Sequence, residues 1–148
     1  MNRHMASASL LLFLIFLGVG FAPAQRVNDK DIEIMMDNLK SDAGRFRSAF
    51  DDSVKKSTIR HTSKEKDAKN LVKRFEDDTK GMLNTFKSHK KADTQLATVI
   101  STGNQIDQVL REATFDDKTN AAWDKVRVEL GQLADAYGVP GLVGAQPR

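Results

Sequence analysis

Apolar residues recur along the chain at alternating steps of three and four, which places them on one face of a helix. The alternation of single apolar and polar residues that is typical of strands is absent. The first such stripe begins after Asn28 or Asp29 and fades near Lys56, and the second runs from Thr62 to about Ser88. The residues of these two stripes are Ile32, Met36, Leu39, Ala43, Phe46, Phe50 and Val54, followed by Ala68, Leu71, Val72, Phe75, Thr79, Met82 and Phe86.

Two further helices are predicted in the second half of the chain. One begins at Asp93, and the other begins at Asp116 or Asp117 and ends before Gly138 and Pro140. Glycine readily adopts the left-handed conformation that ends a helix, and proline cannot continue one. Their stripes are Leu96, Val99, Ile100, Gly103, Ile106, Val109 and Leu110, then Ala122, Trp123, Val126, Leu130, Leu133, Ala134 and Tyr137.

The spacing of these stripes predicts an all-α fold, an up-down-up-down four-helix bundle over residues 25–138. Connections of roughly five or six residues favour antiparallel neighbours. The first two helices are expected to be longer than the last two, so the first hairpin should project at one end. Gly103 lies on an apolar stripe and indicates a close approach there. Residues 139–148 are expected to form a flexible C-terminal tail.

The corner between the first two helices, VKKSTIRHTSKEKDAK at residues 54–69, is the most basic stretch of the chain. Thr62 followed by Glu65 predicts a capping box, in which each side chain binds the other residue's backbone N–H. Ile59 is the isolated apolar residue and is expected to plug the end of the bundle.

The N-terminal residues 1–24 have the pattern of a secretory signal peptide. Arg3 is followed by an apolar run at residues 10–21 and by Ala22-Pro23-Ala24, which predicts cleavage between Ala24 and Gln25. An apolar run of about 12 residues is shorter than the roughly 20 that span a bilayer. We therefore expect export to the periplasm or the cell exterior, with no transmembrane segment in the mature chain. An uncleaved signal anchor is the alternative.

The residue types of the chain argue against several kinds of active site. There is no cysteine, so disulfides, c-type haem and thiol catalysis are excluded. The Glu-x-x-His pairs of di-iron bundles are also missing. Adjacent acids such as Asp51 and Asp52 point about 100° apart on a helix and do not form a carboxylate pair. We expect no catalytic residues, no metal site and no cofactor.

Charge is unevenly distributed over a chain whose net charge is +3. Residues 51–91 hold twelve basic and seven acidic residues, whereas residues 92–148 have a net charge of −3. A solvated helix face with local pairs such as Lys73–Asp77 and Arg74–Asp78 is one interpretation. The other is a site for lipopolysaccharide, acidic lipid or phosphate. The absence of aromatic residues among these lysines argues against nucleic acid. The candidate anion-binding residues are Lys55, Lys56, Arg60, Lys64, Lys66 and Lys69.

The stretch VNDKDIEIMMDNLKSDAGRFRSAFDDSVKKSTIRHTSKEKDAKNLVKRFEDDTKGMLNTFK, residues 27–87, resembles small secreted helical proteins of Gram-negative soil bacteria that are uncharacterised. The resemblance implies compartment and fold, and it assigns no site. The hypothesis that fits these observations is a non-catalytic protein-interaction or stress-related module of the cell envelope, binding a protein partner or a second copy of itself. The alternative is an anion-binding module that uses the basic corner.

Overall fold

The computed structural model describes residues 27–142, and within that range it contains four α-helices and no strand. The helices are α1 (Asp29–Ser53), α2 (Ser63–His89), α3 (Asp93–Glu112) and α4 (Asp117–Tyr137), with a 3-10 turn, η1 (Val54–Lys56), after α1. The prediction of an all-α chain with four helices is confirmed. The proposed signal peptide, with its cleavage site at Ala24 and Gln25, lies outside the described residues. No described helix combines the length and the apolar character that a membrane crossing requires.

The helices begin and end where local chemistry favours it. The Asn28 side chain accepts a hydrogen bond from the backbone N–H of Asp31 (2.9 Å), and Asp116 accepts one from the N–H of Thr119 (2.8 Å). These bonds satisfy N–H groups that have no partner within the helix. Gly138 ends α4 with φ of 65°. The predicted boundaries at Asn28, Asp116 and Gly138 are therefore confirmed.

The capping box predicted at the start of α2 does not form. Thr62 is the N-cap, as expected, but its hydroxyl donates to the carbonyl of Ile59 (2.5 Å). Glu65 accepts from the backbone N–H of His61 (2.7 Å) rather than from that of Thr62. His61 has φ of 62°, in the left-handed region. The glutamate thus stabilises the turn that precedes the cap.

The predicted stripes form one hydrophobic core that runs the length of the helices. Its centre is a group of aromatic rings from three helices. Trp123 of α4 lies 4.8 Å from Phe46 of α1 and 5.4 Å from Phe75 of α2, measured between ring centroids. Ile59 is buried at the corner end, as predicted. Val109 departs from the prediction because it is only half-buried.

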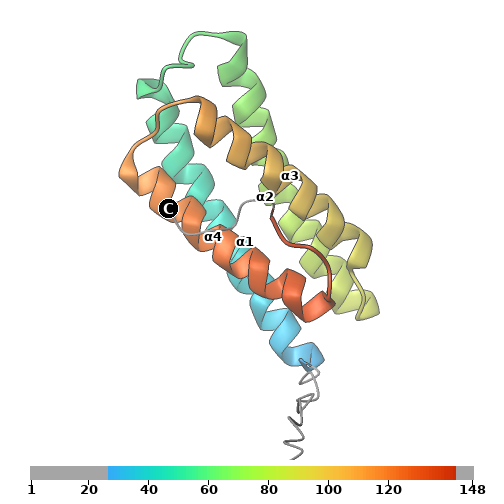
Figure 1. The fold of residues 1–148 in the computed structure, drawn as a ribbon. Coiled ribbons are helices and arrows are strands. Elements are labelled where there is room, and N and C mark those ends of the chain that lie inside the picture. The colour runs from blue at the N-terminus through green and yellow to red at the C-terminus, as the bar shows by residue number, and fades with distance from the viewer. Residues whose placement is uncertain (1–26, 143–148) are drawn as a thin grey trace, which may run out of the picture.

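The helices pack as a bundle in which α1 lies against both α2 and α4, and α2 lies against α3 (Figure 1). The α1–α2 corner extends beyond the connection between α3 and α4. Two bonds tie α4 to the end of α1: the Thr119 hydroxyl donates to the carbonyl of Ala49 (3.1 Å), and the Asp116 N–H donates to the Ser53 hydroxyl (3.0 Å). Direct packing between α3 and α4 is looser.

The chain after α4 packs on the bundle, which corrects the prediction of a flexible tail for residues 139–142. Leu142 is buried, with 5% of its surface exposed, and Val139 packs against the core. A Cβ placed on Gly103 would lie only 2.9 Å from Cδ2 of Leu142. The close approach predicted at Gly103 is therefore real, and the C-terminal segment is its nearest partner. Residues 143–148 lie outside the described range.

Candidate binding groove

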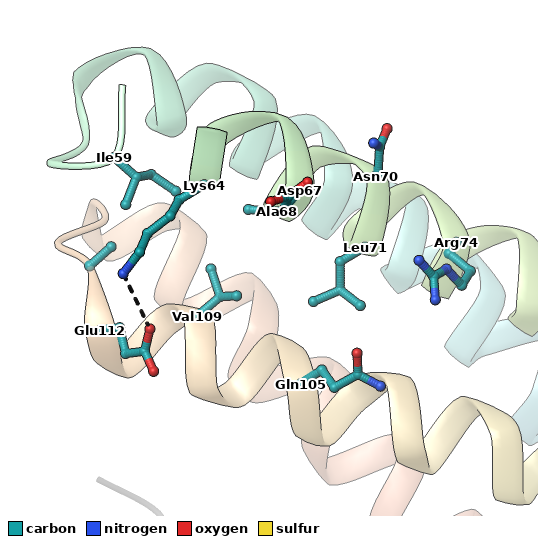
Figure 2. A pocket seen from close by; sticks show the side chains of 11 residues that line it. Ile59, Lys64, Asp67, Ala68, Asn70, Leu71, Arg74, Gln105, Val109 and Glu112 are labelled. Atoms are coloured by element: carbon teal, nitrogen blue, oxygen red, sulfur yellow. Dashed lines mark ion pairs between the residues drawn. The ribbon is translucent and has the colours of Figure 1, made fainter. Parts of the chain in front are cut away.

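A groove of about 440 Å³ lies between α2 and α3 at the corner end of the bundle (Figure 2). Its α2 wall follows helical spacing, so that one face of the helix supplies Lys64, Asp67, Ala68, Leu71 and Arg74. The α3 wall comes from Gln105, Val109 and Glu112, again at steps of four and three. Ile59, Asn70 and Ala113 complete the lining.

The floor of the groove is apolar. Leu71 and Val109 point into the space between the two helices (Figure 2), and Ile59 covers the corner end. Ala68 and Ala113 have only methyl side chains, so they leave part of the space between the two helices unfilled. The half-exposure of Val109, which the stripe pattern did not predict, follows from this opening. The groove therefore offers apolar surface to a ligand.

The rim of the groove is charged, and its two ends differ. At the corner end, Lys64 spans the mouth to reach Glu112, with 3.9 Å between Nζ and Oε2 (Figure 2). Both side chains are more than half exposed, so this ion pair contributes at most about 1 kcal/mol and opens readily. At the other end, Arg74 has no ion pair with any residue between 27 and 142. Arg74 and Gln105 both line this part of the groove, and the Arg74 guanidinium can receive a carboxylate.

The six candidate anion-binding residues are not brought together as one site. Lys64 points toward α3, whereas Lys66 lies two positions further along α2, about 200° around the helix. Lys69 binds Glu65 (2.6 Å) and Lys55 binds Asp52 (3.2 Å).

The remaining three cations of that set form no ion pair within residues 27–142; they are Lys56, Arg60 and Lys66. Of the local pairs expected along α2, Lys73–Asp77 is confirmed at 2.6 Å. The pair Arg74–Asp78 is not formed, and this leaves Arg74 available at the groove.

Two clusters of buried charge escaped the sequence analysis. In the first, Asp107 of α3 is 1% exposed, accepts a hydrogen bond from the Trp123 indole (2.6 Å) and lies 3.6 Å from Nε of Arg127. In the second, Asp42 of α1 binds Lys125 of α4 (2.7 Å). The signal was present in the sequence, because each acid and Arg127 lies three or four residues from stripe residues on its own helix.

The second cluster contains a pair of carboxyl groups in contact. Glu129 of α4 lies beside Asp42, and burial together with the neighbouring Asp42 raises the pKa of Glu129 to about 7. Burial opposes ionisation of Asp42, but hydrogen bonds and charges from Lys125, Glu129 and Arg45 outweigh it, and its pKa is lowered. The two carboxyl groups therefore hold one proton between them, and that proton resides mainly on Glu129. Neither residue lines the groove, so this pair is not combined with that binding surface.

Compared with known proteins, the chain matches no family model, no curated protein and no solved structure. Inference about its function rests on the geometry described above. Among the described residues, the groove between α2 and α3 combines apolar surface with a charge that is available to a ligand.

Proposed function

We propose that this chain is an exported, non-catalytic, up-down-up-down bundle of the cell envelope that binds a protein partner through the groove between α2 and α3. The observation that carries the proposal is the combination of an apolar floor with Arg74, whose guanidinium has no ion pair within the described range. A partner helix that packs across two helices presents apolar side chains at steps of three and four. We infer an amphipathic helix that places apolar residues against Leu71 and Val109 and a carboxylate against Arg74.

Crosslinking from within the groove tests this proposal. With a photo-crosslinking residue at Gln105 in the full chain, we expect an adduct whose linked peptide is amphipathic and carries Asp or Glu. Arg74→Glu should weaken capture roughly tenfold, because an exposed hydrogen bond to a charged group contributes about 1.5 kcal/mol.

Two controls make this crosslinking result specific to the groove. Lys66→Glu changes an exposed lysine on a different face of α2 and should leave capture unchanged. The same crosslinker at Ala121, which is exposed on α4, should give no adduct. Equal capture at Gln105 and Ala121, or full capture by Arg74→Glu, would contradict the proposal.

A specific observation also supports the anion-binding alternative. Lys56, Arg60 and Lys66 form no ion pair within residues 27–142. This alternative predicts that Lys56→Glu, Arg60→Glu and Lys66→Glu together abolish retention on vesicles of acidic lipid. Retention by the unmodified chain should also fall steeply as salt is raised. Arg74→Glu is the matched control, because it reverses an unpaired charge outside the corner. If the triple variant is retained like the unmodified chain, this alternative fails.

The export part of the proposal has its own test. We expect the intact mass of protein recovered from the cell envelope to correspond to a chain that begins at Gln25. Recovery of a chain that still carries residues 1–24 would favour the retained anchor instead. This measurement is independent of the groove, because no groove residue is altered.

A further inference from the structure

Three charged side chains of α2 lie along the rim of the groove in the order positive, negative, positive. Lys64, Asp67 and Arg74 all line the groove, and each is exposed (Figure 2). Lys64 precedes Asp67 by three residues and Arg74 by ten. At 1.5 Å per residue, the three residues extend over about 15 Å of the helix axis, and Asp67 lies about 10 Å from Arg74 along it. The α2 rim therefore presents a charge pattern of fixed spacing.

The charges of this rim are available to a ligand. Asp67 and Arg74 form no ion pair with any residue between 27 and 142. Lys64 reaches across the groove to Glu112, but both side chains are more than half exposed and the charged atoms lie 3.9 Å apart. Because exposed ion pairs are weak, Lys64 can exchange Glu112 for a carboxylate of a ligand at little cost. All three groups can thus take part in recognition.

The α3 rim does not repeat this pattern. Gln105, Val109 and Glu112 line that side, and Glu112 alone among them is charged. Asn70, the remaining polar residue on the α2 side, is neutral. A helix that lies in the groove therefore meets most of the charge on α2. The order and spacing of these charges decide which charged residues the partner can place there.

We propose that the groove selects a partner helix, antiparallel to α2, that presents an acidic, a basic and an acidic residue to Arg74, Asp67 and Lys64. This inference rests on the proposed function and adds the register of the partner. On an ideal helix, residues i, i+7 and i+11 lie within about 40° of one another and extend over about 16 Å. The acid at i meets Arg74, the base at i+7 meets Asp67, and the acid at i+11 meets Lys64.

The same pattern rejects partners that have the wrong order of charges. A partner with an acid at i+7 would place that carboxylate beside Asp67, and a base at i+11 would face Lys64. Two like-charge contacts would then replace two attractive ones. Specificity commonly depends on such repulsive contacts as well as on attractive ones.

Two designed helical peptides of identical composition test this proposal. Both carry the same apolar stripe and a Glu at position i. The first has Lys at i+7 and Glu at i+11, and the second has these two residues exchanged. In fluorescence anisotropy with the full chain at low salt, we expect the first peptide to bind roughly tenfold more tightly, because attractive pairs replace repulsive ones at two positions. The difference should vanish in about 1 M salt, where charges are screened beyond roughly 3 Å.

Reversing the charges on the protein should reverse the preference. With Lys64→Glu and Asp67→Lys made together, we expect the second peptide to bind more tightly than the first. Lys66→Glu changes an exposed lysine on a different face of α2 and should leave the original preference unchanged. Arg74→Glu should weaken the binding of both peptides alike, because each presents Glu at position i.

Three results would overturn the charge pattern: equal affinity of the two peptides at low salt, a preference that the double exchange does not reverse, or binding of neither peptide. The crosslink at Gln105 decides separately whether the groove binds a partner from the cell envelope. A crosslinked adduct without a preference between the peptides would therefore reject the pattern and leave the proposed function in place.

Discussion

Replacing Asp107 by alanine is expected to lower the free energy of unfolding by about 3–5 kcal/mol, the usual cost of removing one partner of a buried ion pair. The Asp107 carboxylate is almost fully buried and lies between α3 and α4. It accepts the indole N–H of Trp123 at 2.6 Å and faces the guanidiniums of Arg127 at 3.6 Å and Arg111 at 3.8 Å. Alanine would leave the buried indole N–H without this acceptor and Arg127 without this counter-charge. Urea denaturation followed by far-UV circular dichroism measures the loss.

Two companion variants separate charge from hydrogen bonding at this position. Asp107→Asn keeps an oxygen that can accept from Trp123 but removes the negative charge, so we expect a smaller loss, about 1–3 kcal/mol. Replacing Asp107 by leucine and Arg127 by methionine together should cost less than Asp107→Ala, because an apolar pair can substitute for a buried ion pair, but about 1–3 kcal/mol should remain since the Trp123 indole still loses its acceptor. A loss below about 1 kcal/mol for the alanine variant would contradict the role assigned to the carboxylate.

Stability is also expected to fall as the pH rises from 5 to 8.5, because of Glu129. Its pKa in the folded protein is raised to about 7, from an ordinary value of 4.5, chiefly by burial and by the adjacent Asp42. Between these two values the folded chain holds a proton that the unfolded chain releases. The associated stability is fully present below about pH 4.5 and is lost as the pH passes 7. A shift of this size corresponds to about 2–3 kcal/mol after allowance for partial exposure.

Glu129→Gln should make the stability profile flat over this range. The glutamine amide can donate to Asp42 at every pH, so the variant should match the protein at pH 5 and exceed its stability at pH 8.5. Glu112→Gln, at the exposed rim of the groove, is the matched control and should follow the unmodified profile. Urea titrations at each pH provide the measurement. Parallel profiles for the protein and Glu129→Gln would show that Glu129 does not carry the effect.

The carboxyl pair also predicts the behaviour at the acid end of the profile. The pKa of Asp42 is lowered by Lys125, Glu129 and Arg45 against the opposing effect of burial. The stability contributed by its ionised form is present above its ordinary pKa and is lost as the pH falls through the lowered value. The two carboxyl groups therefore act in opposite directions. They favour a stability maximum in mildly acidic conditions.

The helices could be predicted from the sequence because their signals are local. Seven apolar residues at helical spacing define α1, and the Gly138–Pro140 pair ends α4 by backbone conformation alone. Nearly every stripe residue is buried in the structure. These features depend on periodicity and on the properties of single residues, so no knowledge of the partner helix is needed.

The features that the sequence did not predict depend on contacts between distant segments. Leu142 stands among glycines and a proline, a composition typical of a mobile tail, and its burial requires Gly103 from another helix. Glu65 accepts from the N–H of His61, which has a left-handed conformation, while the N–H of Thr62 donates to the carbonyl of Ile59.

The groove was beyond sequence reasoning for the same reason. It is lined by residues of α2, of α3 and of the chain that follows α3, and periodicity along one helix does not show which residues of another helix lie opposite. The basic character of the corner could be predicted from its amino-acid composition. Its division into paired and unpaired cations required the positions of the neighbouring acids, Asp52, Glu65 and Glu112.

Trp123 is the only tryptophan of the chain, and its position makes it an optical reporter of assembly. From α4 it contacts Phe46 of α1 and Phe75 of α2, and it binds Asp107 of α3. Its fluorescence therefore depends on the presence of every other helix. Because α4 meets α1 across a long stretch of chain, this docking is expected to be a late folding event. In a stopped-flow refolding experiment, the change in Trp123 fluorescence would therefore give the rate at which all four helices come together.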